Sequence, residues 1–235
     1  MKVAVVGHER KLIEDKLPEF NLELDKENPD VVISFGGDGT ALYGERVYPG
    51  IPRIMIKHSK GCVKCKEHDF SKVLNALREK RYQIKDEIKV EVIINNDPKK
   101  KLIGLNEVGI HHKIPTKAIR LKIKVNGKII EDEQISDGLI VATPYGSTAY
   151  FYSICRKKFS KGLGIAFKNP KSGKISTIVD DNSIIETEVL RGFGLVAADN
   201  DEKMFEVTAG DRILIKKAKE KARIIEIKRK RVVEV

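Results

Sequence analysis

The spacing of the apolar residues changes near residue 82, and this change constrains the fold more than any other feature of the chain. Before it, Lys2–Gly7 and Val31–Phe35 are nearly continuous apolar runs rich in β-branched residues. Such runs are typical of strands that are covered on both faces in a parallel sheet. Phe70–Lys80 then places its apolar residues at helical spacing, as on the buried face of an amphipathic helix. The first third of the sequence therefore predicts an α/β layer.

The rest of the chain follows a period of two. Ile88–Ile94 and Ala118–Val125 alternate apolar and polar residues, which is the pattern of strands with one buried face. Asn126–Gly127 comes directly after the second of these strands and is a strong signal for a tight hairpin. Together the patterns predict an α/β plus β architecture, with a small Rossmann-like domain over residues 1–86 and a mostly antiparallel β domain over residues 87–235. The pattern leaves open whether the last strand returns to the first domain.

Composition excludes several classes of protein. With 235 residues, 41% of them hydrophobic, the chain is long enough for two compact domains. Its longest apolar runs fall well short of the roughly 20 residues that a membrane-spanning helix needs, and no cleavable signal precedes the first strand. Three cysteines suit a reducing compartment, so a cytoplasmic protein is predicted. The net charge of +11 favours polyanionic partners, from nucleic acid to phosphorylated small molecules.

A glycine-rich segment, Phe35–Thr40 with the sequence FGGDGT, follows the second buried run. At the carboxyl edge of a parallel strand, Gly36, Gly37 and Gly39 let the backbone turn sharply and present N–H groups to a phosphate. Asp38 within this turn suits a divalent metal or a transferred proton. The alternative interpretation is an ordinary strand-to-helix turn that Asp38 caps.

Two further segments carry polar residues in apolar surroundings. Asn106 and Glu107 suit an adenine edge and ribose hydroxyls, although a hairpin turn explains the pair equally well. In Ser136–Tyr150, a buried strand joins an acidic turn to a turn rich in glycine and hydroxyl groups. Such groups gather at a helix start, where an anion or polar ligand binds. The alternative for this segment is an N-cap formed by Ser147 or Thr148.

Taken in order, GGDGT, LNEV and DGLIVATPYGSTAY resemble the motifs of the NAD kinase family, of the archaeal and bacterial type that uses ATP or polyphosphate. The similarity runs from about residue 31 to about residue 155 and returns near Gly194–Asp199. GGDGT alone is shared with diacylglycerol, sphingosine and phosphofructo kinases, whereas the third motif singles out the NAD kinases. The resemblance implies transfer of a phosphoryl group from ATP or polyphosphate to the adenosine ribose 2′-hydroxyl of NAD, giving NADP.

The resemblance also assigns roles to individual residues. Asp38 matches the catalytic carboxylate, and the residues that match the phosphate loop are Gly36, Gly37, Gly39 and Thr40. The positions that match the NAD-binding residues of the family are Asn106, Glu107, Lys117, Asp137, Thr148, Ala149, Tyr150 and Ser153. Mg²⁺ or another divalent metal is the implied cofactor. A homodimer or homotetramer is the implied assembly, and neither a membrane nor a nucleic acid is an expected partner.

Two departures from the family pattern stand out. Ile135 occupies the position, two residues before the motif aspartate, where the family carries a basic residue. The segment after the third apolar run is also unlike the family, and it carries a possible four-ligand zinc set, His58, Cys62, Cys65 and His68. An exposed basic loop with incidental thiols is the alternative to a zinc site.

Two other functions remain compatible with the sequence. A lipid or sugar kinase would share GGDGT, although the segment from Thr143 to Tyr150 argues against it. A dinucleotide-binding regulator without catalytic activity would be consistent with the positive charge and with the departures. The phosphoryl donor, the preference between NAD and NADH, the subunit number and the effect of Ile135 stay open at this point.

Overall fold

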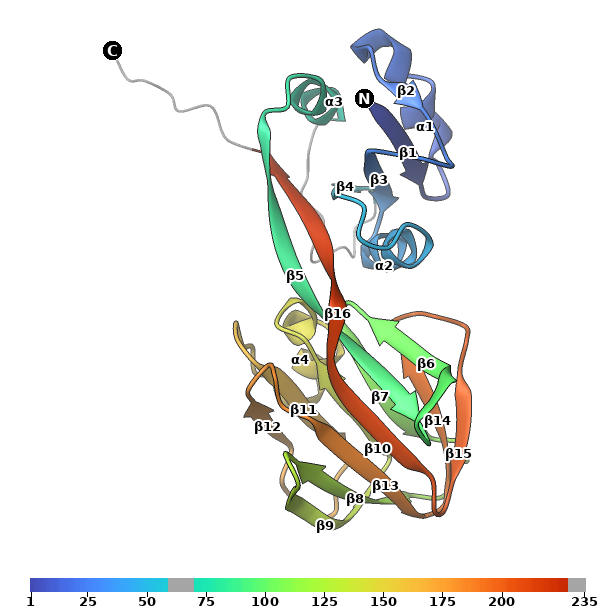
Figure 1. Ribbon diagram of the computed structural model, residues 1–235, viewed down its shortest axis with the longest axis vertical. Coiled ribbons are helices and arrows are strands. Elements are labelled where there is room, and N and C mark those ends of the chain that lie inside the picture. The colour runs from blue at the N-terminus through green and yellow to red at the C-terminus, as the bar shows by residue number, and fades with distance from the viewer. Residues whose placement is uncertain (59–69, 228–235) are drawn as a thin grey trace, which may run out of the picture. The chain divides into compact units, whose positions relative to one another are not determined.

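The computed structural model describes residues 1–58 and 70–227 (Figure 1). The chain divides into two compact units. One unit is formed by Met1–Glu87 with the segment that begins at Lys221, and the other by Ile88–Glu220.

The first unit is built on parallel strands. They are β1 (Lys2–Val6), β2 (Glu23–Leu24), β3 (Val31–Gly36) and β4 (Arg53–Lys57). β1 pairs with β2 on one side and with β3 on the other, and β3 pairs with β4. Val3 and Val5 belong to the main core cluster, whereas Ala4 and Val6 belong to a smaller cluster on the other face. Both faces of β1 are therefore covered, as its continuous apolar run predicts.

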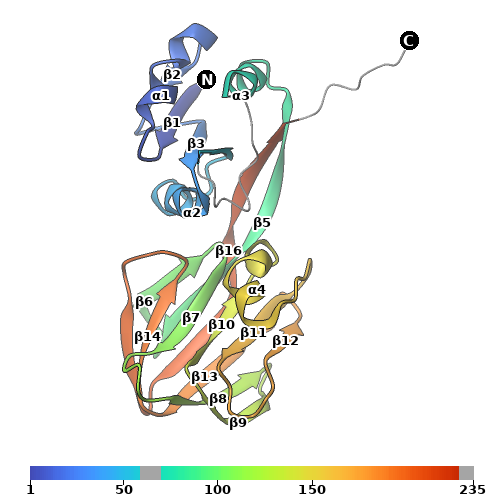
Figure 2. The same cartoon turned by 180° about the vertical axis from the view of Figure 1, so that it is seen from behind.

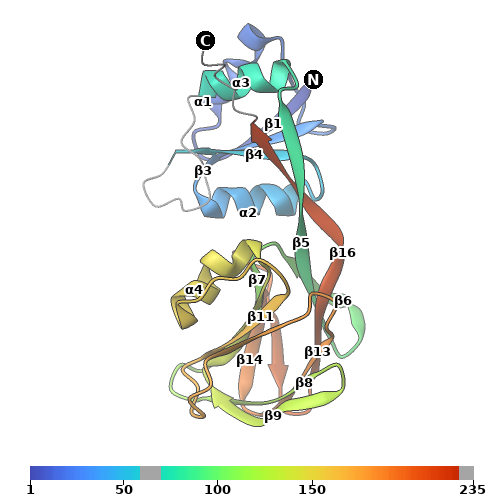
Figure 3. The ribbon, with the colours of Figure 1, turned by 90° about the vertical axis from the view of Figure 1, so that its left-hand side faces the viewer.

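Helices cover the two faces of this sheet. They are α1 (Lys11–Glu14), the short 3₁₀-helix η1 (Leu17–Phe20), α2 (Asp38–Val47) and α3 (Phe70–Arg78). Figure 3 shows α2 on one side of the strands and α1 and α3 on the other. α3 buries Val73, Leu74 and Leu77 in the main core cluster, which confirms the predicted amphipathic helix.

A buried ion pair joins α2 to β4. The Nη2 atom of Arg53 lies 2.5 Å from the Oε2 atom of Glu45, and the two side chains are only 0% and 3% exposed. Arg53 also donates a hydrogen bond of 2.8 Å to the carbonyl oxygen of Tyr48. Because water reaches neither charge, each depends on the other and on nearby polar groups for its stabilisation.

The second unit contains two sheets that share one core. The strands of the first sheet in this unit are β5 (Tyr82–Ile94), β6 (Asp97–Gly104), β8 (Ile119–Val125), β9 (Lys128–Ser136), β13 (Ile185–Arg191) and β16 (Arg212–Ile227). In the second sheet, each strand is antiparallel to its neighbours. The spatial order of its strands is β12 (Ser176–Val179), β11 (Leu163–Lys168), β10 (Gly138–Ala142), β7 (Glu107–His112), β14 (Phe193–Ala198) and β15 (Phe205–Thr208). Apolar residues of both sheets, including Ile123 of β8 and Val141 of β10, form one buried cluster.

The predicted hairpin joins β8 to β9. Asn126 and Gly127 have φ angles of 50° and 77°, and Val125 pairs with Lys128 across the turn. Two successive residues with positive φ match the twist of the flanking strands, and Asn-Gly adopts this conformation with little strain. The hairpin signal in the sequence is therefore confirmed.

A short helical segment covers the outer face of the second sheet. It comprises the 3₁₀-helix η2 (Tyr145–Thr148) and α4 (Tyr150–Cys155). α4 lies against β10 and β11 (Figure 2), where Phe151 is fully buried beside Ile140 and Ala166. The N-cap residues of the two helices are Pro144 and Ala149, and neither helix has a side-chain cap. The alternative of an N-cap by Ser147 or Thr148 is therefore wrong.

β16 takes part in both units. Its first part pairs antiparallel with β13, with Ile215 opposite Ile185. Its last part runs parallel to β4, with Ile224 in register with Arg53. The chain thus returns to the first unit at the end of the described residues.

The observed architecture, a parallel α/β unit and an antiparallel β unit, confirms the predicted fold class. Within residues 1–58 and 70–227, none of the helices has the length and apolar character that a membrane crossing requires.

Candidate functional site

The predicted phosphate loop links β3 to α2. Gly36 ends β3 with a φ angle of 155°, and a Cβ atom at this position would lie 2.4 Å from the Oγ1 atom of Thr40. Asp38 is the first residue of α2, the N-cap residue is Gly37, and no side chain caps the helix. The interpretation of Asp38 as a helix cap is therefore wrong, and its side chain is half-buried.

A pocket of about 550 Å³ lies beside this loop at the carboxyl end of β1. Gly39 and Thr40 line it from the first turn of α2, and the basic residues of its lining are His8, Arg10 and Lys26. The positive dipole end of a helix favours an anion near its first turn. The pocket therefore suits a polyanion such as a chain of phosphates.

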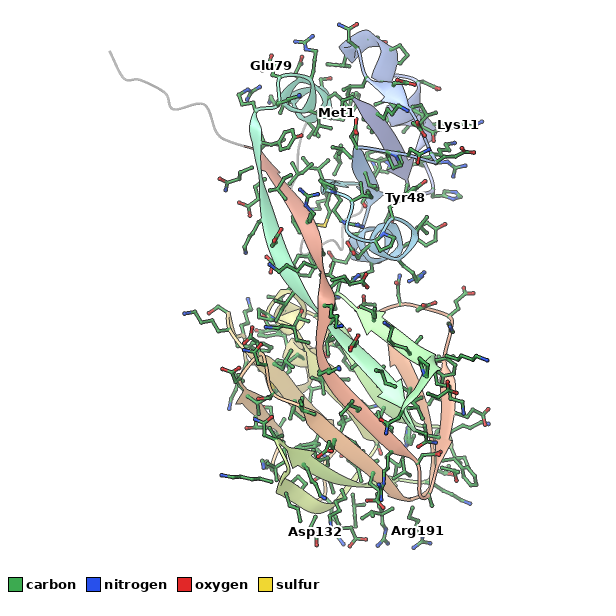
Figure 4. All side chains as sticks on the ribbon, in the orientation of Figure 1. Met1, Lys11, Tyr48, Glu79, Asp132 and Arg191 are labelled. Atoms are coloured by element: carbon green, nitrogen blue, oxygen red, sulfur yellow. The ribbon has the colours of Figure 1, made fainter. Side chains whose placement is uncertain are left out.

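Glu14 holds two of these basic residues in place. Its Oε1 atom lies 3.5 Å from Nε of Arg10 and 3.2 Å from Nζ of Lys26. Tyr48, labelled in Figure 4, donates a hydrogen bond of 2.9 Å to the carbonyl oxygen of Lys26. Both basic side chains thus have an acidic neighbour at the edge of the pocket.

The resemblance implies a divalent metal, and the loop fits one way of binding it. Among the described residues, no group of three or more His, Cys, Asp or Glu side chains gathers to hold a metal ion. Mg²⁺, however, is usually bound by one or two carboxylates together with substrate phosphates and waters. Asp38, which precedes Gly39 of the pocket, fits this second arrangement.

A second polar cluster surrounds Asn106 and Glu107 in the other unit. The carboxylate of Asp199 accepts hydrogen bonds from three successive backbone N–H groups, those of residues 105–107, at 2.7, 2.8 and 3.1 Å. In return, the N–H group of Asp199 donates a 3.0 Å hydrogen bond to the carbonyl oxygen of Glu107. The segment connects β6 of one sheet to β7 of the other, so the hairpin-turn interpretation of the pair is wrong.

Thr143 ties the same segment to the third motif. Its Oγ1 donates a 2.6 Å hydrogen bond to the carbonyl oxygen of Leu105 and accepts one of 3.1 Å from the N–H group of Gly146. Its own N–H group donates to the carbonyl oxygen of Asn106 at 2.8 Å. A Cβ atom at Gly146 would lie 2.0 Å from that carbonyl oxygen, so only glycine fits there. Backbone contacts therefore hold these motifs together.

Replacement of Asp199 by Ala is expected to lower the free energy of unfolding by about 2–3 kcal/mol, because three backbone donors lose a charged acceptor. Urea denaturation measures this change. Asp201→Ala is the matched control, since the Oδ1 atom of Asp201 accepts a backbone hydrogen bond from its near neighbour in the chain, the N–H group of Lys203, at 3.1 Å. Equal losses of stability in the two variants would contradict the role that we assign to Asp199, which is to accept hydrogen bonds from three backbone groups.

Three predicted NAD-binding residues share one electrostatic environment. The pKa of the Tyr150 phenol is raised, first by partial burial and then by the negative charges of Glu107 and Asp137. Asp137 lies in the turn before β10, with its Oδ1 atom 3.6 Å from Nδ1 of His112. Because Tyr150 begins α4, these residues gather near the start of that helix.

The other predicted dinucleotide-binding residues are less closely grouped. Thr148 and Ala149 join η2 to α4, directly before Tyr150. Ser153 donates its hydroxyl hydrogen to the carbonyl oxygen of Tyr150 at 2.7 Å. Asn106 directly precedes β7, whereas Lys117 lies in the connection that follows β7. The two residues are therefore at opposite ends of this strand. The structure therefore does not bring Lys117 together with the Asn-Glu pair.

His58 is the one predicted zinc ligand within the described part of the chain. Its ring stacks on that of Phe35, with 4.4 Å between the ring centroids, and it contacts the carboxylate of Glu9. The other three predicted ligands, Cys62, Cys65 and His68, lie outside the described residues. The zinc site stays a hypothesis.

Sequence reasoning missed two polar residues beside Asp137, namely His111 and Lys168. Each is the cross-strand neighbour of Gly138, one on β7 and the other on β11. The signal for Lys168 was a charged residue at the end of the apolar run LGIAF. This signal alone did not place Lys168 beside Asp137, because the spacing of the motifs does not reveal the order of the strands in the sheet.

A family model described as ATP-NAD kinase C-terminal domain matches residues 105–227, more than half of the 235-residue chain. The match includes the Asn106–Glu107 segment and the segment that ends in α4. The chain belongs to the NAD kinase family. The predicted resemblance is thereby confirmed.

Curated members of the family show the same relationship over much of the chain. An NAD kinase of Lactobacillus gasseri is 32% identical over 186 residues, which cover 73% of this chain and 65% of that protein. An NAD kinase of Pyrococcus furiosus is 36% identical over 146 residues, or 59% of this chain and 52% of that protein. The chain thus spans less than two thirds of the length of these relatives. Neither relative is a lipid or sugar kinase.

Two solved structures of the family share the fold. A crystal structure of an NAD kinase from Archaeoglobus fulgidus in complex with ATP has a TM-score of 0.80 at 23% identity, covering 97% of this chain and 94% of that one. The structure of yeast NADH kinase complexed with NADH has a TM-score of 0.84 at 15% identity, covering 96% and 83%. At these identities the likeness concerns the fold.

Proposed function

We propose that this member of the NAD kinase family transfers the terminal phosphoryl group of ATP to the adenosine ribose 2′-hydroxyl of NAD, giving NADP and ADP. The observation that carries the proposal is the phosphate loop, in which Asp38 opens α2 beside a basic pocket. The dinucleotide motifs of the second unit support it. An ATP complex of the Archaeoglobus fulgidus relative favours ATP as the donor, with polyphosphate as the alternative.

The first unit supplies the groups that phosphoryl transfer needs. The backbone of Gly36, Gly37 and Gly39, with Thr40, holds the donor phosphates near the start of α2. Asp38 accepts the proton of the attacking 2′-hydroxyl, so that the ribose oxygen bonds to phosphorus as the bond to the leaving ADP oxygen breaks. A bound Mg²⁺, held by Asp38 and the phosphates, would neutralise charge on the transferred group.

Residues of the second unit hold the dinucleotide. The Asn106 amide contacts adenine and the Glu107 carboxylate accepts hydrogen bonds from ribose hydroxyls, both on a backbone that Asp199 fixes. The further proposed contacts come from Lys117, Asp137, Thr148, Ala149, Tyr150 and Ser153. Fixed side chains and backbone of this kind contribute to catalysis mainly by positioning the substrate.

The same proposal covers the setting of the reaction. NAD and ATP are the small-molecule partners, and the enzyme works in the cytoplasm. The assembly is a homodimer or homotetramer. Size-exclusion chromatography with light scattering determines the number of subunits.

The direct test incubates the purified full chain with NAD, Mg²⁺ and ATP, and detects NADP with an NADP-specific dehydrogenase. NADP is expected with ATP, and a parallel reaction with polyphosphate measures the second donor. Binding of NAD without NADP from either donor would refute the proposed activity and favour a dinucleotide-binding regulator.

A further inference from the structure

A pair of basic residues meets over a glycine on the outer face of the second sheet. Gly138 of β10 lies between His111 of β7 and Lys168 of β11 in the sheet register. A Cβ atom at Gly138 would lie 1.9 Å from the carbonyl oxygen of Ile110, so no side chain fits there. Because residues in register project from the same face, the two flanking side chains reach each other, with 2.6 Å between Nζ of Lys168 and Nδ1 of His111.

Burial determines the charge of this pair. The pKa of His111 is lowered to about 4, first by burial and then by the positive charge of Lys168. The pKa of Lys168 is lowered to about 8 by burial, an effect that Asp137 partly offsets. At pH 7 the ammonium group of Lys168 therefore donates a hydrogen bond to a neutral imidazole. In residues 1–58 and 70–227, no carboxylate lies within ion-pair distance of Lys168.

An ammonium group in this position retains hydrogen-bonding capacity for a ligand. It carries three N–H donors, and the hydrogen bond to His111 uses one of them. A half-buried cation with a neutral protein partner is poorly solvated, so an anionic ligand stabilises it. Ile135, two residues before Asp137, contributes no positive charge of its own, whereas Lys168 places one near Asp137.

Other charged and titratable groups surround the pair and limit what binds there. They are Glu107 and His112 of β7, Asp137 before β10, and Tyr150 at the start of α4. Two carboxylates nearby disfavour a free, highly charged anion. They suit a ligand that offers one phosphate to Lys168 and polar hydroxyl or amide groups to the carboxylates, as a dinucleotide does.

We propose that Lys168, oriented by His111, binds a phosphate group of the dinucleotide substrate or product. The inference rests on the proposed function, because it places the ligand of that reaction on the α4 face of the second sheet. Lys168 donates to a phosphate oxygen, and His111 keeps the ammonium group directed over Gly138.

Calorimetric binding of NAD, NADP and inorganic phosphate to the full chain and its variants tests this subsite. Lys168→Met, which keeps a long side chain without the charge, is expected to weaken binding of the dinucleotides by about tenfold to a hundredfold. Lys168→Arg restores the charge and most of the affinity. The control is Lys171→Met, because Lys171 is an exposed lysine in the connection that follows β11. This variant is expected to bind the dinucleotides as tightly as the unchanged protein does.

The pH dependence separates charge from packing. Between pH 7 and pH 9 Lys168 loses its proton, because its pKa is about 8, whereas His111 is already neutral and the pKa of Tyr150 is raised. Dinucleotide affinity of the unchanged protein should fall across this range, while that of Lys168→Met and Lys168→Arg stays flat.

The outcomes are distinct. Unchanged dinucleotide affinity in Lys168→Met would overturn the subsite while leaving the proposed kinase activity intact. Loss of phosphate binding alone, with dinucleotide affinity preserved, would show a site for free phosphate and also overturn it. If neither the unchanged protein nor any variant binds a dinucleotide, the proposed function and the subsite are refuted together.

Discussion

Asp38→Asn should lower kcat for NADP formation by about a thousandfold while changing the dissociation constant for NAD less than about threefold. The amide keeps the size of the side chain but neither accepts the 2′-hydroxyl proton nor offers a negative charge to a divalent metal. A change confined to kcat is the expected signature of a group that acts on the reacting atoms. Steady-state kinetics and calorimetric NAD binding measure the two effects separately.

Asp15→Asn is the matched control for this substitution, because Asp15 follows α1 in the same unit and lies on the surface. Its turnover and its thermal unfolding should equal those of the unchanged protein. Turnover that survives Asp38→Asn in a folded variant would remove Asp38 from the chemistry and the phosphate loop from the centre of the proposed mechanism.

Glu45→Ala should lower the free energy of unfolding by about 3–5 kcal/mol, which is the usual effect of leaving one charge of a buried pair without its partner. Arg53 is fully buried and lies 2.5 Å from Glu45, so its charge would lose this partner in surroundings that water does not reach. Glu45 also accepts a 3.3 Å hydrogen bond from the N–H group of Gly50. Chemical denaturation of the full chain measures the loss.

Two comparisons make this result specific. Glu79→Ala removes one partner of an exposed pair, in which Arg81 lies 3.0 Å away and the side chains are 45% and 32% exposed, so a much smaller loss is expected. The double variant Glu45→Leu, Arg53→Leu should be more stable than Glu45→Ala, because it leaves no unpaired charge. A loss below 1 kcal/mol for Glu45→Ala would contradict the assigned burial of the pair.

Local sequence signals identified much of the fold because they depend on neighbouring residues. The apolar run Val31–Phe35 predicts a strand covered on both faces, and the structure buries each of its residues. Asn126–Gly127 predicts the β8–β9 hairpin through its preference for positive φ. The motif with Asp38 likewise marks a strand-to-helix turn, where Gly36 has a positive φ angle and a Cβ atom would meet the side chain of Thr40.

Interactions between distant segments could not be predicted in this way. The carboxylate of Asp199 binds backbone groups more than ninety residues earlier in the chain, and its residue type is common in ordinary turns. Lys168 meets His111 only because β10 lies between their strands. The alternative of a helix cap by Ser147 or Thr148 rested on residue preference and was wrong, since neither η2 nor α4 has a side-chain cap.

The proposed phosphoryl transfer is tested most directly by ³¹P NMR of a reaction containing the purified chain, NAD, ATP and Mg²⁺. The account predicts a new phosphomonoester signal on the adenosine ribose 2′-oxygen, appearing together with ADP in equal amounts and absent with Asp38→Asn. Release of ADP and inorganic phosphate with NAD unchanged would contradict the account, as would a phosphate on any other oxygen of the dinucleotide.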